Sequence, residues 1–384
     1  MKFLKNLLKV LVVLFGLLIA ILYITDTDYL LKAVRTIYMR GYTTAFLDDY
    51  KRFDNRTIDV GTPQPWPNHK KYNTAKETET LQKANKDWGT VAYVIIKNDS
   101  IWYENYFDGY NENSKSNSFS MAKSYVSGLL GKALMEGYIK SLDEPVCNYL
   151  PEFCDGLAAK MTVGDLSTMS SGTNWDEAYY SPLSITTRAY FDDDLAKVMN
   201  GLKVVEEPGK AFKYASGDTQ MLAMVIEKAT GKKLYTYLEE SFWKPLGSEN
   251  QTLWQVDSDE HDLVKAYCCI ASNAKDFARF GKLYKDHGKW NGKQVLDSAF
   301  VAKSLTPKFD PVYGYGWWLK NYNGKDFKMM RGHLGQYVIV QPEDNVIIVR
   351  LGHQKSPDAG IGHYTKDISL YIDEAYKMLN QNEN

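Results

Sequence analysis

Strand-forming segments lie at both ends of the main part of the chain. Residues 90–97 are rich in β-branched side chains, and a short polar turn at Asn98-Asp99 leads into a returning strand. A second hairpin crosses Pro342-Glu343-Asp344. The predicted strands are residues 90–97, 101–107, 315–319, 336–341 and 345–351. Segments so far apart predict one sheet assembled from distant parts of the chain.

Between these strands the apolar residues recur with helical spacing, separated by long loops. Gly231 follows one such run, as is typical of a helix end. The predicted helices are residues 120–136, 163–169, 195–199, 218–230, 234–243, 273–285 and 367–379, with a helical lead-in near 29–50. A mostly helical lobe at about 141–272 is therefore inserted into an α/β (α+β) fold.

The first residues have a different pattern. Lys2, Lys5 and Lys9 flank an apolar run that extends from Leu7 to Ile24. Its length lies between a signal-peptide core and a membrane-spanning helix, and bulky residues replace a small-residue cleavage site. We expect an uncleaved membrane anchor, with a cleaved signal peptide as the alternative. The positive-inside rule then places the body outside the cytoplasm, in the cell envelope (periplasm), or secreted if the segment is removed.

These patterns divide the chain into three parts. Residues 1–28 are the anchor or signal segment, and residues 29–67 are a helical lead-in that ends in a proline-rich linker at 61–67. Each proline disfavours helix at the residue before it, so the linker is extended. The main domain is expected over residues 68–384.

Composition narrows the function only a little. A net charge of −1 gives no reason to expect nucleic acid as a partner. The 28 Tyr and 9 Trp residues suit an aromatic-lined cleft and a large core equally well. The six His residues are scattered, and no Cys/His cluster has zinc spacing, so we expect neither a metal nor a cofactor.

The four cysteines suit an exported protein. Cys147 and Cys154 flank a short loop and are a disulfide candidate in an oxidising compartment. Cys268 and Cys269 are adjacent, and because vicinal disulfides are rare we expect two buried free thiols.

The candidate chemistry begins with an S-x-x-K pattern at Ser120 and Lys123. Positions i and i+3 share a helix face, so the hydroxyl and the amine can meet. A lysine acts as a base only if burial or nearby positive charge lowers its pKa, and the flanking residues are mostly apolar. Free backbone N–H groups at the helix start supply half of an oxyanion hole. The pattern also arises by chance, so its context decides.

Two later stretches supply that context. Tyr214-Ala215-Ser216 follows Pro208-Gly209 and precedes a helix, and His333-Leu334-Gly335-Gln336 leads into a strand. With residues 161–172 and 274–281, in this order and spacing, the chain resembles the serine β-lactamase and penicillin-binding protein superfamily. The resemblance covers roughly residue 68 to the C-terminus and is closest to the class C-like branch of esterases and amidases. That branch includes carboxylesterases, D-aminopeptidases and 6-aminohexanoate-dimer hydrolases.

The resemblance implies a β-lactamase-like fold, with an antiparallel sheet flanked by helices, and a set of roles. Ser120 would be the acylated nucleophile, and Lys123 would take its proton or hold the network. Tyr214 would relay protons, and its phenol would need the Lys123 ammonium nearby to ionise near neutral pH. The backbone N–H groups of Ser120 and Gln336 would form the oxyanion hole. The substrate would be a small ester or linear amide.

Two departures from the family's pattern bear on the substrate. Ser216 stands where β-lactamases carry Asn, and His333 stands where they carry Lys. Both weaken a β-lactamase or D-alanyl carboxypeptidase interpretation, which stays open, as does a non-catalytic sensor of the same fold. His333 is expected to be a neutral donor beside Tyr214 or Ser120. The substrate-binding residues that the resemblance implies are Ser216, His333, Gly335, Trp175, Tyr179 and Tyr180.

Overall fold

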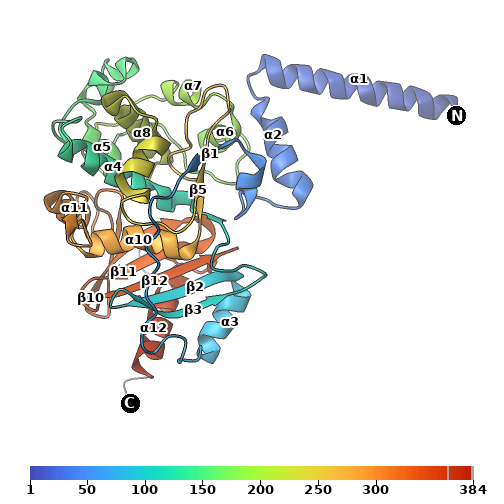
Figure 1. Cartoon of the computed structure of the whole chain (residues 1–384). Coiled ribbons are helices and arrows are strands. Elements are labelled where there is room, and N and C mark those ends of the chain that lie inside the picture. The colour runs from blue at the N-terminus through green and yellow to red at the C-terminus, as the bar shows by residue number, and fades with distance from the viewer. Residues whose placement is uncertain (361–362, 382–384) are drawn as a thin grey trace.

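The structure is a computed structural model, and it describes residues 1–360 and 363–381. A helical lobe stands on a sheet layer, and α10 lies between the two (Figure 1). The strands are β1 (Asn55–Ile58), β2 (Thr90–Lys97), β3 (Ser100–Tyr106), β4 (Ser116–Asn117), β5 (Thr252–Gln255), β6 (Ile270–Ser272), β7 (Lys289–Trp290), β8 (Lys293–Gln294), β9 (Trp318–Tyr322), β10 (Lys325–Gly332), β11 (Gln336–Gln341) and β12 (Val346–Gly352). The α-helices are α1 (Lys2–Ile24), α2 (Tyr29–Thr36), α3 (Glu79–Asp87), α4 (Ala122–Met135), α5 (Val163–Ser167), α6 (Ile185–Phe191), α7 (Leu195–Asn200), α8 (Ser216–Thr230), α9 (Leu234–Leu238), α10 (Ala274–Lys285), α11 (Ser298–Ser304) and α12 (Lys366–Asn380). The short helical turns are η1 (Tyr38–Arg40), η2 (Asp49–Arg52), η3 (Phe119–Met121), η4 (Val146–Asn148), η5 (Pro151–Phe153), η6 (Ala158–Lys160), η7 (Glu239–Trp243) and η8 (His333–Gly335).

The main sheet is antiparallel and has the order β3-β2-β12-β11-β10-β9. Both of its faces are buried, because α10 covers one and α3 with α12 covers the other. Val94 and Ile96 of β2 point into the core on the α10 side, and Tyr93 and Ile95 point into the opposite core. This sheet joins the two ends of the main domain as predicted, and the predicted fold class is confirmed.

The sheet also shows where the pattern of the sequence misleads. The strand predicted at residues 315–319 is β9, which begins three residues later. Residues 314–317 form a tight turn at Gly316 instead, whose φ is 74°. The pattern does not predict β10 at all, since Lys325, Lys328 and Arg331 interrupt its apolar residues. Strand pairing on both sides stabilises β10 in spite of its polar composition.

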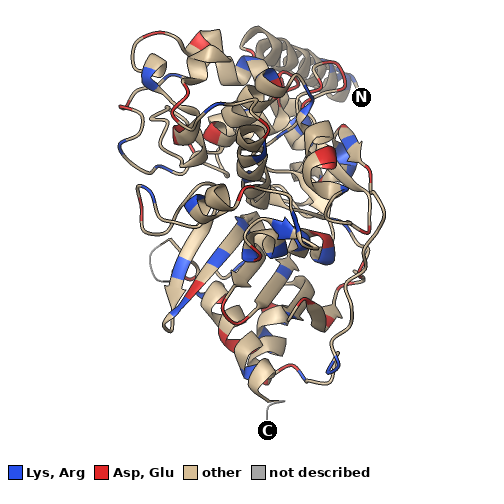
Figure 2. Cartoon of the chain, turned by 60° about the vertical axis from the view of Figure 1, so that its left-hand side comes forward, with Lys and Arg blue, Asp and Glu red and all other residues tan. Residues whose placement is uncertain are grey.

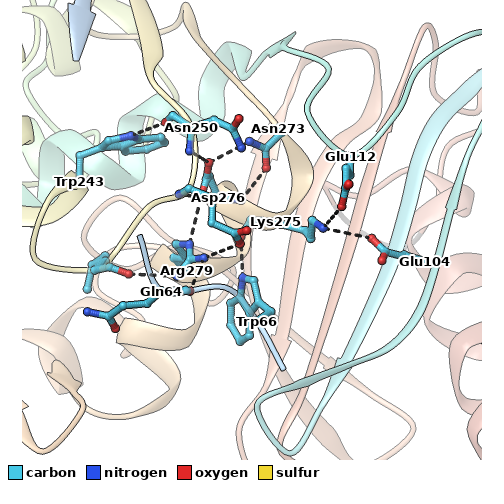
Figure 3. Close-up of polar contacts among 12 residues, drawn as sticks. Gln64, Trp66, Glu104, Glu112, Trp243, Asn250, Asn273, Lys275, Asp276 and Arg279 are labelled. Atoms are coloured by element: carbon cyan, nitrogen blue, oxygen red, sulfur yellow. Dashed lines mark hydrogen bonds and ion pairs between the residues drawn. The ribbon is translucent and has the colours of Figure 1, made fainter. Parts of the chain in front are cut away.

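A smaller sheet, β1-β5-β6-β4, connects the lead-in to the segment that precedes Ser120. β1 pairs with β5, so residues before position 68 pack into the main body. The linker is held as well: Arg279 of α10 donates to the carbonyl of Gln64 at 2.8 Å, and Trp66 donates to the carbonyl of Lys275 at 3.1 Å (Figure 3). The lead-in is less helical than predicted, because regular helix ends with α2 and only η1 and η2 follow.

The first helix, α1, stands apart from this packing. It runs away from the body beyond α2 (Figure 1), and none of its residues is buried. An 18-residue window of this helix has a mean hydropathy of 2.9, and the length and composition of α1 suffice to cross a membrane. Charged residues of both signs are spread over the body (Figure 2), whereas α1 carries none after Lys9.

Candidate active site

The backbone before Ser120 is held in an unusual conformation. Phe119 has a φ of 44°, in the left-handed region that non-glycine residues rarely occupy. Its N–H donates to the Asn117 side chain at 2.9 Å, and the Ser118 N–H donates to the Ile270 carbonyl at 2.7 Å. These bonds offset the local strain, and such strain is common at functional sites. The turn brings Ser120 to the start of the η3–α4 helical segment, as predicted.

Lys123 lies one turn after Ser120 and faces it. Its Nζ donates to Ser120 Oγ at 2.8 Å and to the Tyr267 carbonyl at 2.9 Å. The lysine is only 3% exposed, and this burial lowers its pKa to about 8, although the Glu177 carboxylate opposes the shift. A usable fraction of the amine is therefore neutral near physiological pH and able to accept the Ser120 proton.

Tyr214 completes the cluster from the loop before α8. The Lys123 Nζ lies 5.1 Å from the centroid of its ring, and Tyr214 lines the same recess as Ser120. Burial, assisted by the Glu177 carboxylate, raises the pKa of Tyr214 above its usual value. The expected lowering by Lys123 is wrong, because burial desolvates the phenolate and the Glu177 carboxylate repels it. Tyr214 therefore remains a protonated donor at neutral pH.

Glu177 is a member of the site that the motifs do not identify. One carboxylate oxygen accepts from the Ser216 hydroxyl at 2.5 Å and from the Tyr179 hydroxyl at 3.1 Å. The other accepts from Trp175 Nε1 at 2.6 Å. This carboxylate acts on the pKa of both Lys123 and the tyrosine beside it. The sequence shows Glu177 only as an acidic residue of the loop after Gly172, and it lies far from Ser120 in the chain.

His333 occupies the wall beside Ser120 and is stacked on Tyr179, with ring centroids 5.2 Å apart. Burial lowers the pKa of His333 to about 4, with a smaller contribution from Lys355, so the imidazole is neutral. Its Nε2 lies 3.3 Å from the hydroxyl of Thr44 in the lead-in. The structure therefore pairs His333 with Thr44 instead of the predicted Tyr214 or Ser120.

The other predicted substrate-binding residues divide into two groups. Tyr179, Tyr180 and Ser216 line the open space beside Ser120. Trp175 does not line it: it is buried, and its ring packs against Gly217 at the start of α8. Trp175 therefore does not form the cleft wall that was predicted, because its indole is buried and donates its N–H to the Glu177 carboxylate.

The turn between β10 and β11 closely approaches the backbone that precedes Ser120. A Cβ on Gly332 would lie 2.3 Å from the Ser118 carbonyl oxygen, so only glycine allows this approach. Arg350 donates to the Gly335 carbonyl at 2.8 Å, and the Gln336 amide side chain is fully used in bonds to Gly352 and His333. The backbone N–H of Gln336 remains the predicted oxyanion donor.

Ser120 lies between two recesses of different character. The first is a largely apolar pocket that opens to solvent. The second is polar and includes Tyr214, Trp318, Arg331 and Lys355. Two buried N–H groups of Arg331 have no hydrogen-bond partner. The site thus contains positive charge that the replacement of lysine by His333 alone does not suggest.

Both cysteine pairs are joined. Cys147 and Cys154 form a disulfide with Cα atoms 4.8 Å apart. Cys268 and Cys269 also form one, so the expected free thiols are wrong. The backbone turns sharply at Cys269, where φ is 78°, and this brings the adjacent side chains together. Cys268 lines the apolar pocket.

Comparisons with known proteins agree with this architecture. A family model described as Beta-lactamase matches residues 76–368. The chain is 23% identical over 307 residues to "6-aminohexanoate-dimer hydrolase" of Paenarthrobacter ureafaciens, covering 74% of this chain and 77% of that protein. It is 23% identical over 343 residues to "Putative D-alanyl-D-alanine carboxypeptidase" of Escherichia coli (strain K12), covering 72% and 73%. The solved structure "Putative 6-aminohexanoate-dimer hydrolase from Bacillus anthracis" superimposes with a TM-score of 0.72 and 20% identity, over 92% of this chain and 94% of that chain.

Proposed function

The chain belongs to the beta-lactamase family, and from this premise we propose that it hydrolyses a small ester or linear amide through an acyl-enzyme on Ser120. One observation carries the proposal: a buried lysine with a pKa of about 8 donates a 2.8 Å hydrogen bond to the serine hydroxyl. An amine that sheds its proton near neutral pH, in contact with a hydroxyl, is an activated nucleophile pair. Family membership alone would not establish activity.

The geometry supports a sequence of proton transfers. In acylation Lys123 takes the proton of Ser120 as its oxygen attacks the substrate carbonyl. Tyr214, which holds its proton at neutral pH, donates to the leaving alcohol or amine as the C–O or C–N bond breaks. Water then attacks the ester on Ser120 and gives its proton to the tyrosinate, while Lys123 returns its proton to the Ser120 oxygen as the acid leaves. The Ser120 and Gln336 N–H groups would stabilise the negative oxygen in both steps.

Covalent labelling tests this proposal. A fluorophosphonate should add its phosphonyl group to Ser120, detected by intact and peptide mass spectrometry, and short-chain nitrophenyl esters should be hydrolysed. Ser120→Ala should lose both, whereas Ser124→Ala, a serine of the same helix that donates to the Gly316 carbonyl, should keep both. Absence of any adduct and any turnover in the wild type would favour a non-catalytic sensor.

A D-alanyl carboxypeptidase is the second candidate. The unpartnered N–H groups of Arg331, with Lys355 beside them, suit the terminal carboxylate of a peptide substrate. Release of D-alanine from a peptide that ends in D-alanyl-D-alanine, at a kcat/KM above that for nitrophenyl esters, would promote this candidate over the ester or amide hydrolase.

The location of the protein is part of the proposal. We place α1 in the cytoplasmic membrane and the body outside the cytoplasm, since α1 is largely apolar and unburied and carries its lysines in its first turns. Full-length protein in the membrane fraction, with the body sensitive to protease added outside the cytoplasm, is the expected result. A mature N-terminus beyond Ile24 would instead show a cleaved signal peptide.

A further inference from the structure

The apolar pocket beside Ser120 is built partly by the segment that follows the membrane helix. Ala33, Ile37, Tyr38 and the stretch 43–45 form one wall. The loop before α6 and α6 itself supply further lining residues. The nucleophile is therefore reached through a pocket whose lining begins nine residues after the last residue of α1.

The mouth of this pocket exposes apolar side chains that lie next to lining residues in sequence. Met39 is 77% exposed beside Tyr38, and Leu183 is 71% exposed beside Pro182. Tyr180, which lines the pocket, is 67% exposed. Single exposed apolar residues are ordinary, but a group around a pocket entrance indicates contact with an apolar partner.

The residues that follow α1 are bound to the elements around the pocket. Asp26 forms ion pairs with Arg188 of α6 and with Lys197 of α7, the latter at 2.8 Å. Tyr29 donates from its hydroxyl to the Pro182 carbonyl at 3.1 Å. Only residues 25–28 separate α1 from α2, and four residues reach at most roughly 14 Å even when extended. A bilayer that contains α1 is thus held close to the pocket mouth.

We infer that the pocket mouth faces the bilayer and that the pocket takes the apolar acyl chain of a membrane-resident amphiphile. This inference rests on the proposed hydrolase function and specifies its substrate class. The acyl chain of the substrate enters from the bilayer past the exposed side chains of Met39, Tyr180 and Leu183, which form the rim of the pocket. Its carbonyl reaches Ser120, and the polar leaving group lies in the recess of Tyr214, Arg331 and Lys355.

The reaction balances without any further reactant. The Ser120 oxygen bonds to the acyl carbon and its proton passes to Lys123, while the bond to the head group breaks and the head group leaves with a proton from Tyr214. Water then attacks the acyl carbon and gives its proton to Tyr214, while Lys123 returns its proton to the Ser120 oxygen as that bond breaks. The products are a fatty acid and the head-group alcohol or amine. Each methylene of the acyl chain that is buried in the apolar pocket adds favourable transfer free energy, so long acyl groups are favoured.

A chain-length series tests the pocket. With the full chain in detergent, kcat/KM for nitrophenyl esters should rise from acetyl toward dodecanoyl by up to about fourfold per methylene, which corresponds to about 0.8 kcal/mol, until the pocket is full. Ala45→Trp, which places a large ring on the half-buried lining, should lower the dodecanoyl rate more than the acetyl rate, so that the ratio of the two kcat/KM values falls. A fluorophosphonate adduct on Ser120 of this variant shows that the site is folded.

A vesicle assay tests the orientation. The full chain in phosphatidylcholine vesicles that contain a fluorogenic long-chain acyl ester should turn the ester over. Met39→Asp combined with Leu183→Asp should reduce this rate, relative to a soluble acetyl ester, by at least about tenfold, because charges replace two apolar contacts with the bilayer. Val205→Asp, at an exposed apolar residue outside both recesses, is the matched control and should behave as the wild type.

Different results would overturn the membrane-amphiphile inference and the proposed hydrolase function. If acetyl esters are hydrolysed but the rate does not rise with chain length, and the rim variant matches the Val205→Asp control, the membrane-amphiphile inference is overturned and the hydrolase stands. If no ester is hydrolysed and Ser120 takes no fluorophosphonate, the proposed function itself is wrong.

Discussion

Replacement of Lys123 by methionine should make the protein more stable and inactive. The lysine is buried, and its pKa falls from 10.5 to about 8 on folding. A tenfold loss of proton affinity corresponds to about 1.4 kcal/mol, so keeping the ammonium in the fold costs roughly 3 kcal/mol of stability. Methionine has a similar length and no charge, so Lys123→Met removes this penalty.

The gain is partly offset by lost hydrogen bonds. The Ser120 hydroxyl and the Tyr267 carbonyl each lose a partner, at about 1 kcal/mol each. The net result at pH 7 is a variant about 1 kcal/mol more stable than the wild type. Turnover of short nitrophenyl esters should fall by about 10²–10⁴-fold, the usual contribution of an acid–base group.

The sign of this difference should depend on pH. Because the folded pKa of Lys123 lies below the unfolded value, the penalty is complete below pH 8 and disappears as the pH rises from about 8 to 10.5. The stability advantage of Lys123→Met should therefore shrink over this window and then reverse, leaving only the lost hydrogen bonds. No other titrating group differs between the two proteins, so the comparison isolates this lysine.

Urea unfolding of the detergent-solubilised full chain, followed by tryptophan fluorescence from pH 7 to 10.5, provides the measurement. Lys86→Met, at an exposed lysine of α3, is the control and should alter neither stability nor turnover. A Lys123→Met variant that is less stable than the wild type at pH 7, or one that keeps its esterase rate, would refute the argument that a desolvated lysine serves as the base.

Three further outcomes follow from the site. The kcat/KM of the wild type should rise with pH through about 8 as Lys123 loses its proton. Glu177→Gln should move this rise to lower pH, because it removes the carboxylate that raises the lysine pKa. A pH profile that does not move would contradict the effect of Glu177 on Lys123. Tyr214→Phe should slow amide hydrolysis by about 10²–10³-fold and nitrophenyl esters less, because nitrophenolate leaves without a donated proton; equal losses for both substrates would argue against a donor role. The wild type should prefer a neutral nitrophenyl ester to benzylpenicillin, because the pKa of His333 is lowered to about 4 and the imidazole is uncharged. His333→Lys should reduce the ratio of the two kcat/KM values only in part, because Ser216 remains. A wild type that favours benzylpenicillin would promote the β-lactamase alternative.

The sequence determined the elements whose pattern is local. The two hairpins of the main sheet and the helix that ends at Gly231 appear where the β-branched and helical patterns predict them. The Ser120 and Lys123 pair could be read from spacing, because residues three apart on a helix share a face wherever that helix lies. Tyr214 could be placed only through the family resemblance, since nothing near it in sequence marks it as part of the same site.

The tertiary structure decided what depends on distant neighbours. The burial that lowers the pKa of Lys123, and the burial and Glu177 carboxylate that raise that of Tyr214, arise where separate loops and helices meet. The same holds for the support of Glu177 by Trp175, for β10 between two partner strands, and for the contact of Thr44 in the lead-in with His333. Desolvation and electrostatic interaction depend on distance in space, and residues far apart in the chain become neighbours only when the fold is complete.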